Sequence, residues 1–307
     1  MNFTGGRTDT REVLFQCSAS WTSEIHGEFI YLSAFSIFLS IIAVLGNTLI
    51  LIGLRKVSSL HPPSKLLFRC LATTDLCVGL ITMTLSFVYW ISLTHEELNL
   101  CRYAVIPSTI ASYTLSSVSL LAISVDRLLA LLLGLRYRQV VTLKRTYVIV
   151  VLFWIMSAVA SLLYLLDRII PIWYGRILIP VCLVTSIASY TKIFLKLRRH
   201  QTQVHGHVLQ EQPGPINPLN IKRYRKAVAS ALWVQCTLVA CYLPFIVVRP
   251  LVDDDNSSPS SFVVYNFAVT LVFLNPSLNP FLYCWKIREV KQAVKETIRE
   301  ALCCFST

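Results

Sequence analysis

The chain has 307 residues, of which 55% are hydrophobic and only 14% are charged, and its mean hydropathy is +0.61. Soluble domains carry about 25% charged residues, so this composition excludes a soluble globular protein. The 10 Gly and 13 Pro show no period, and the 10 Cys are too few for a disulfide scaffold, which excludes collagen-like and disulfide-rich classes. The composition therefore predicts an integral membrane protein.

Seven apolar stretches are long enough to cross the hydrocarbon core of a bilayer, which takes about 20 helical residues. In chain order they cover residues 30–54, 66–93, 103–135, 147–166, 177–195, 227–248 and 261–285. We therefore predict an all-α protein with three parts: an extracellular segment (1–29), a seven-transmembrane helix bundle (30–285), and a cytoplasmic amphipathic helix with a tail (286–307).

The charges between the spans predict the orientation. Most Lys and Arg residues fall in alternate connections, whereas Asp and Glu gather in the others. Because cytoplasmic loops retain Lys and Arg, the N-terminus is expected outside the cell and the C-terminus inside. The net charge of +12 then faces anionic lipid and cytosolic partners. It does not call for a nucleic-acid partner.

Polar side chains inside the spans are candidate functional residues, because charge within a bilayer is costly. Asp75 lies in the middle of the second span, and the related positions are Asn47, Ser116, Asn275 and Asn279. A carboxylate with several neutral oxygen atoms suits a hard monovalent cation or a water cluster. The alternative is that these side chains only join helices through mutual hydrogen bonds.

Further marks lie near the cytoplasmic ends of the spans and at their prolines. Asp126 and Arg127 close the third span, Pro244 interrupts the sixth, and the seventh contains Asn279-Pro280-Phe281-Leu282-Tyr283. A proline within a helix removes a backbone donor and permits a kink. One such proline is common in membrane helices, whereas the combination is not.

Together these residues resemble the rhodopsin-like (class A) G-protein-coupled receptors, from about residue 30 to 304. Gly46-Asn47, Leu71 with Asp75, Asp126-Arg127 and Trp154 look like the marks of helices one to four. Leu135-Arg136-Tyr137 resembles the second inner loop, and Tyr190, Cys241 with Pro244, and Asn279-Pro280 to Tyr283 resemble the later marks.

The resemblance implies roles for these residues in activation. Arg127 would turn from Asp126 to meet a heterotrimeric G protein, while Leu135 would contact that partner. Tyr190 and Tyr283 would move toward Arg127 as helix six swings around Tyr242 and Pro244. Asp75, Ser116, Asn275 and Asn279 would form a sodium site, with Asn47 in its water network.

Some positions depart from the family pattern. Leu128 replaces the aromatic residue after Arg127, and Tyr224 stands where many members carry an acid that holds the arginine. Any inactive-state lock must then depend on Asp126, and we expect raised basal signalling. Tyr242 replaces the usual tryptophan of the helix-six hinge.

The outer surface also departs from the family. Cys101 lies near the position of the family's disulfide cysteine, but the loop from Asp167 to Arg176 contains no cysteine. The short loop resembles that of melanocortin receptors. Cys17 is the remaining extracellular candidate, and an oxidising compartment permits a Cys17–Cys101 bond. Asn2 and Asn256 start glycosylation sequons on the same side.

After the seventh span, apolar residues recur at helical spacing between Lys and Arg, at Ile287, Val290, Val294, Ile298 and Leu302. Such an amphipathic helix is typical of binding to a lipid surface. Cys303 and Cys304 at its end are candidate palmitoylation sites. The alternative is a solvated tail with free thiols.

The ligand pocket follows from the resemblance. Thr109 stands where amine receptors carry an aspartate, which argues against a biogenic amine and leaves a peptide, a lipid or another small molecule. The lining candidates are Thr109, Tyr113, Tyr242, Phe245, Arg249 and Phe273. Arg249 either meets an anionic group or extends to the membrane interface.

The predicted function is that of a plasma-membrane receptor that converts an extracellular ligand into G-protein activation and is not itself an enzyme. It needs no cofactor beyond a bound sodium ion. The alternative is an ion-coupled transporter or channel that uses the polar cluster around Asp75. A membrane enzyme is a distant third, because the sequence shows no nucleophile and base pair.

Overall fold

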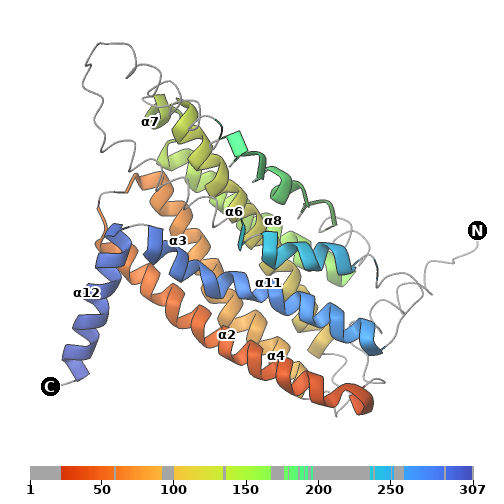
Figure 1. Cartoon of the computed structure of the whole chain (residues 1–307). Helices are drawn as coiled ribbons and strands as arrows, with labels where there is room; N and C mark the ends of the chain where they lie inside the picture. The colour runs from red at the N-terminus through yellow and green to blue at the C-terminus, as the bar shows by residue number, and fades with distance from the viewer. Residues whose placement is uncertain are drawn as a thin grey trace, which may run out of the picture.

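The computed structural model describes residues 22–58, 60–91, 100–133, 136–166, 259–286 and 288–305, with parts of 176–195 and 236–251. Within these ranges every regular element is a helix, and the long helices lie side by side in a bundle (Figure 1). The predicted all-α fold class is therefore confirmed.

The helices follow the predicted spans with shifted ends. They are α2 (Thr22–Lys56), α3 (Pro62–Cys77), η2 (Val78–Met83), α4 (Thr84–Ile91), η4 (Cys101–Val105), α6 (Ile106–Leu133), α7 (Tyr137–Val140), α8 (Leu143–Leu166), α11 (Pro259–Lys286) and α12 (Arg288–Phe305). The second span is the continuous run α3–η2–α4, in which η2 is one π-helical segment. Proline at the first position of α3 suits a helix start, because the missing N–H would have no partner there.

Among the described residues, five helical segments are long and apolar enough to cross a membrane: Gly27–Lys56, Pro62–Trp90, Tyr103–Asp126, Leu143–Leu166 and Ser260–Trp285. They correspond to predicted spans one, two, three, four and seven. The described parts of the fifth and sixth predicted spans contain the shorter apolar helices Arg176–Ser189 and Val239–Arg249.

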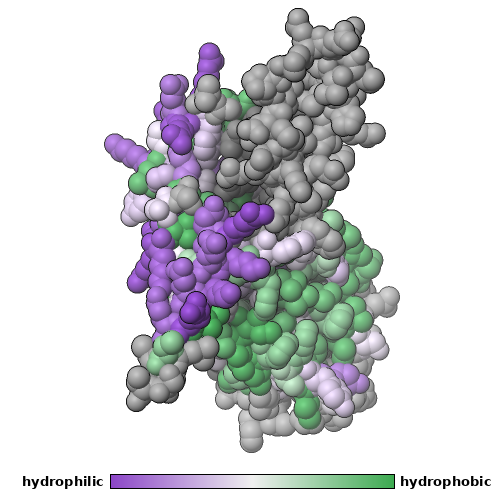
Figure 2. All heavy atoms as spheres, turned by 60° about the vertical axis from the view of Figure 1, so that its left-hand side comes forward, coloured by the Kyte–Doolittle hydropathy of each residue, from purple (hydrophilic) through white to green (hydrophobic). Residues whose placement is uncertain are grey.

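The outer surface of the bundle is apolar. Tyr31 of α2 is 79% exposed and Leu166 of α8 is 85% exposed, and many other large hydrophobic side chains on these two helices are also exposed. Figure 2 shows a broad hydrophobic face next to a band of hydrophilic residues. Water would strongly disfavour so much contiguous apolar surface, whereas lipid chains accommodate it.

The core consists of buried apolar side chains from most of the helices, and small residues let some helices approach closely. A methyl group at Gly79 of η2 would lie 3.0 Å from Val44 Cγ2 and 3.2 Å from Ala43 Cβ of α2. Ser40 of α2 donates a hydrogen bond to the Gly79 carbonyl at 2.9 Å. Small residues and hydroxyl bonds are the usual means of packing helices in membranes.

Helix α12 leaves the end of α11 and runs at a steep angle to the long helices (Figure 1). Its apolar face is divided between two environments. Val290, Ala293 and Val294 are buried and belong to the main core, whereas Ile298 is 40% exposed. The sequence predicted one lipid-facing stripe along this helix, but its first two turns pack on the bundle and only its later turns are left for lipid.

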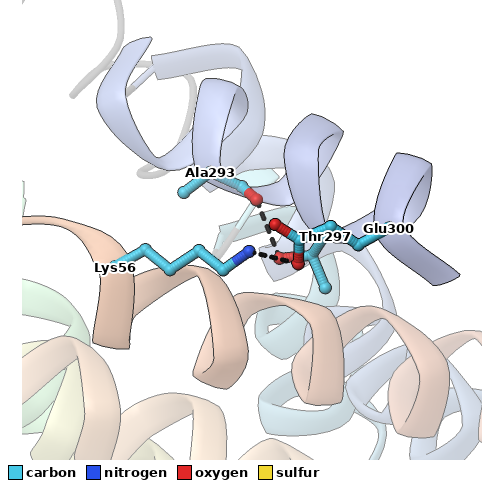
Figure 3. Close-up of polar contacts among 4 residues, drawn as sticks. All are labelled: Lys56, Ala293, Thr297 and Glu300. Atoms are coloured by element: carbon cyan, nitrogen blue, oxygen red, sulfur yellow. Dashed lines mark hydrogen bonds and ion pairs between the residues drawn. The ribbon is translucent and has the colours of Figure 1, made fainter.

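Helix α12 is joined to the end of α2 by one ion pair. Lys56 Nζ and Glu300 Oε2 are 2.6 Å apart, and Thr297 donates to the Ala293 carbonyl within α12 (Figure 3). One turn before Lys56, a methyl group at Gly53 would lie 3.0 Å from Val294 Cγ2. Close packing at Gly53 and the ion pair both lie where α12 crosses α2.

Candidate functional site

Gly46 and Asn47 of α2 both accommodate Pro280, a proline inside α11. A methyl group at Gly46 would lie 2.7 Å from Pro280 Cγ, so only glycine leaves room for the ring. Pro280 has no N–H to donate to the carbonyl one turn earlier, that of Pro276. Asn47 Nδ2 supplies a donor to this carbonyl at 3.1 Å and also donates to Ala43 O at 2.8 Å. The adjacent pair thus accommodates the ring and satisfies the carbonyl that the ring leaves free.

Asp75 of α3 and Asn279 of α11 are in direct contact. Both are fully or almost fully buried, and Asn279 Nδ2 donates to Asp75 Oδ2 at 2.8 Å. These two residues are 204 positions apart in the sequence. The hydrogen bond brings together two of the residues that the resemblance assigns to a sodium site.

Buried polar atoms without a hydrogen-bond partner among the described residues include Asp75 Oδ1, Asn47 Oδ1, Asn275 Nδ2 and Ser117 Oγ. Ser116 is also buried, but the described part of the chain shows no hydrogen bond between it and Asp75. Buried polar groups without partners are costly. A small cation or ordered water would supply a partner for the Asp75 carboxylate oxygen, whereas the Asn275 N–H needs an acceptor, which water can supply.

At the other end of the bundle, Asp126 of α6 is held by two hydroxyl groups. Ser64 Oγ of α3 donates to Asp126 Oδ2 at 2.9 Å, and Tyr137 Oη of α7 donates to Oδ1 at 2.5 Å. The two hydroxyls are themselves 3.2 Å apart, and the His61 ring packs on Tyr137 at 5.1 Å. We call Ser64, Asp126 and Tyr137 the inner clamp. It joins three elements around one buried carboxylate.

The other predicted coupling residues are only partly described. Arg127 lies in α6 directly after Asp126, but its side chain, like all of Leu135 and Tyr190, lies outside the described residues. Tyr283 is buried with its ring edge against Phe68 at 5.2 Å. This contact joins the end of the Asn-Pro motif to α3.

An aromatic cluster joins α6, the helix Val239–Arg249 and α11. Tyr113 packs edge-on against Phe245 at 5.2 Å and against Phe273 at 6.3 Å, and Tyr265 lies 6.1 Å from Phe245. Tyr113, Tyr242, Phe245 and Phe273 are each more than nine-tenths buried. The structure thus brings together four of the six predicted ligand-lining residues in one packed core cluster.

The two polar members of the predicted ligand pocket differ in their bonding. Thr109 donates to the Val105 carbonyl of its own helix at 2.7 Å. Arg249 places its guanidinium over the Phe245 ring, with Cζ 5.7 Å from the ring centroid, and its buried Nε has no hydrogen-bond partner. Thr109 is therefore satisfied locally, and Arg249 is not.

The structure describes some of the predicted cysteine sites and not others. Cys101 is disulfide-bonded, while Cys17, its predicted partner, lies outside the described residues, so the pairing stays a prediction. Cys303 is exposed near the end of α12; the side chain of Cys304 lies outside the described residues. The sequon residues Asn2 and Asn256 also lie outside them.

Three site residues were missed by reasoning from the sequence alone. Ser64 and Tyr137 bind Asp126, although they are 62 and 11 positions from it. Ser117, rather than its neighbour Ser116, has the buried hydroxyl without a partner. Of these residues, only Tyr137 had a sequence signal, its place in the second inner loop. A serine in an apolar helix gives no such signal, because the sequence does not reveal which neighbour it faces.

Comparison with known proteins agrees with this geometry. Residues 46–170 match the family described as 7 transmembrane receptor (rhodopsin family). The chain is 23% identical over 279 residues to melanocortin receptor 4 of Danio rerio, covering 87% of this chain and 82% of that protein. It is 24% identical to adenosine receptor A2a of Homo sapiens (90% and 73% covered) and 25% identical to adenosine receptor A3 of Ovis aries (94% and 93% covered).

The chain is thus similar to multi-pass membrane receptors of the rhodopsin family, the class A G-protein-coupled receptors. Two kinds of receptor match with nearly equal identity, so the comparisons indicate no particular subfamily. The family consists of receptors and not of enzymes, which confirms the prediction that the chain is not an enzyme.

Proposed function

We propose that the protein is a plasma-membrane receptor that converts binding of an extracellular non-amine ligand into nucleotide exchange on a heterotrimeric G protein. In this proposal residues 1–29 are extracellular, residues 30–285 form the membrane domain, and residues 286–307 face the cytosol. The exposed basic residues support this orientation, because they gather where α2 ends, α8 begins and α12 lies: Arg55, Lys56, Lys144, Arg145, Lys291, Lys295 and Arg299. Cytoplasmic ends of spans carry this excess of positive charge.

The observation that carries the proposal is the inner clamp. A carboxylate buried at the end of α6 and held by Ser64 and Tyr137 is next to Arg127, the residue that the resemblance assigns to G-protein contact. As long as the carboxylate is held in place, it attracts the arginine beside it. A ligand that favours release of this pair favours the coupled state, and the G protein stabilises the same state reciprocally.

The Asp75 site is the second part of the proposal. Asp75, Ser116, Asn275 and Asn279 would hold a sodium ion, with Asn47 in its water network. The support is the set of buried oxygen atoms without partners. A bound cation would neutralise the buried carboxylate, whose charge is otherwise costly inside a membrane.

The test uses purified receptor in lipid nanodiscs with a heterotrimeric G protein and labelled GTP. Receptor-dependent exchange is expected for the wild type, and Arg127→Ala should abolish it. The matched control is Arg138→Ala, an exposed arginine of α7. Exchange that is unchanged in Arg127→Ala, or absent with every G-protein subtype, would contradict the proposal.

The same preparation examines the alternative function. Reconstituted into sealed vesicles, an ion-coupled transporter or channel would carry sodium across the membrane without any G protein. We expect no flux above that of empty vesicles. Flux that is lost in Asp75→Asn would instead support the transporter or channel.

A further inference from the structure

Arg249 is a cation without an anionic partner in the part of the chain that the structure describes. It forms no hydrogen bond or ion pair there, and its one contact of note is the stacking over Phe245. Its Nε is buried and unsatisfied. An arginine carries five N–H donors in a planar fork that matches carboxylate and phosphate groups, and a buried Nε–H without an acceptor is unfavourable.

The neighbouring helices offer no acid to Arg249. Helix α11 contains no Asp or Glu, and the only acid of α6 is Asp126, which is occupied in the inner clamp. The Tyr113 hydroxyl, on the other side chain that packs on Phe245, is also buried without a partner. Two polar groups on one aromatic ring thus lack an acceptor.

The surroundings of these groups are apolar and aromatic. Phe245 and Phe273 are almost completely buried, and Tyr265 continues the cluster along α11. Small-molecule sites in proteins are mostly lined by such side chains, with a few polar groups that fix the orientation of the ligand. An anion held by Arg249 would therefore have an apolar body beside it.

We propose that the ligand of this receptor is an oxyanion, a carboxylate or a phosphate, attached to an apolar body, and that Arg249 ion-pairs with its charged group. The inference rests on the proposed function, because it names the ligand class of the same receptor. The apolar body packs against the Phe245 and Phe273 cluster, and the Tyr113 hydroxyl is a second donor for the anion.

The test measures thermal stability of the purified receptor with three matched pairs of compounds. The pairs are oleic acid and oleamide, lysophosphatidic acid and monoacylglycerol, and 3-phenylpropionic acid and its amide. They separate a membrane-borne carboxylate, a phosphate and a soluble carboxylate. For at least one pair we expect the acid to raise Tm by about 2 °C or more while its neutral counterpart does not.

The variants assign this preference to Arg249. Arg249→Gln should abolish it, Arg249→Lys should retain part of it, and Arg176→Gln, at another arginine of the predicted outer side, should leave it intact. Equal shifts for acid and neutral compound in all three pairs would overturn the inference. So would a preference that persists in Arg249→Gln.

A third outcome would also overturn it. If acids are preferred only after Asp253, Asp254 and Asp255 are changed to Asn, the partner of Arg249 is an acid of the chain itself. Basal nucleotide exchange by the wild type is measured in parallel. Its absence would count against the proposed function, and the thermal shifts would still decide the ligand chemistry.

Discussion

At the scale of single residues, the polar groups inside the bundle have defined partners that explain why these residue types are present. Asn47 replaces the donor that Pro280 lacks, and Asn279 binds Asp75. In a bilayer no water is available to satisfy a free backbone carbonyl. The family marks in this chain are therefore solutions to local hydrogen-bonding and packing problems.

Gly46 gives the first prediction. Gly46→Ala places a methyl group within 2.7 Å of the Pro280 ring, and overpacking of this kind costs about 1–3 kcal/mol. We expect a lower Tm in nanodiscs. Gly27→Ala on the same helix is the control, because nothing lies within 4 Å of the added methyl group. Equal Tm values for the two variants would contradict the close approach of α2 and α11.

Asp75 gives the second prediction. Replacing choline chloride with sodium chloride at constant ionic strength should raise the Tm of the wild type by about 3 °C, because an ion that binds only the folded state stabilises it. Asp75→Asn should remove this difference. Asp126→Asn, which alters the other buried carboxylate, should keep it. A sodium effect of equal size in Asp75→Asn would exclude Asp75 as a ligand.

At the scale of elements, the inner clamp connects α3, α6 and α7 through one carboxylate. Helices α3 and α7 each contact Asp126 through a hydroxyl group. Hydrogen bonds to an ionised group contribute about 1.5–3 kcal/mol. The position of the short helix α7 is thus coupled to the state of Asp126.

This coupling gives the third prediction. Tyr137→Phe removes a hydrogen bond that fixes the position of the Asp126 carboxylate, so Asp126 holds Arg127 less firmly, and basal nucleotide exchange should rise by up to about tenfold. Ser64→Ala should act in the same direction. Tyr147→Phe, at an exposed position of α8, is the control and should leave exchange unchanged. Unchanged or lower exchange in Tyr137→Phe would count against the clamp as an inactive-state lock.

Helix α12 gives the fourth prediction, which compares packing with charge. The Lys56 and Glu300 side chains are 34% and 67% exposed, and exposed ion pairs contribute about 0.2–1 kcal/mol. Lys56→Gln should therefore change little, whereas Gly53→Leu should displace Val294 and α12. Amide hydrogen exchange of residues 288–305 measures this. Faster amide hydrogen exchange in Lys56→Gln than in Gly53→Leu would show that the ion pair matters more than the close packing at Gly53.

At the scale of the whole molecule, the surface is divided into an apolar face and a hydrophilic band (Figure 2). The exposed basic residues of α2, α7, α8 and α12 lie at one end of the bundle. Because cationic side chains avoid the hydrocarbon and favour the cytoplasmic leaflet, this arrangement supports the proposed orientation with these residues in the cytosol.

The fifth prediction follows from that orientation. In intact cells, an epitope tag at the N-terminus should bind antibody, and a tag at the C-terminus should bind only after permeabilisation. An even number of spans would put both tags on the same side. Accessibility of both tags from outside would contradict the seven-span topology.

Much of the fold could be predicted from the sequence, because membrane spans depend mainly on local composition. The apolar runs around Leu39 and Leu152 correctly indicated helices, and the order of the helices along the chain was also correct. The prolines of the seventh span lie inside a helix, as the sequence indicated. Asp75 and Asn279 were also found, because a charge or amide in an apolar run stands out. Boundaries were less accurate, as α2 begins at Thr22 and α8 at Leu143, where polar side chains still continue the helix.

The tertiary structure alone decided which of these side chains meet. Ser64 and Tyr137 look ordinary in sequence, and only packing of three elements brings their hydroxyls to Asp126. Likewise, the periodic stripe of α12 is apolar throughout, and only its crossing of α2 at Gly53 divides it between core and lipid. Composition determines that a segment is buried from water, but the partner depends on helix crossing and rotation, which arise from contacts between residues far apart in the chain.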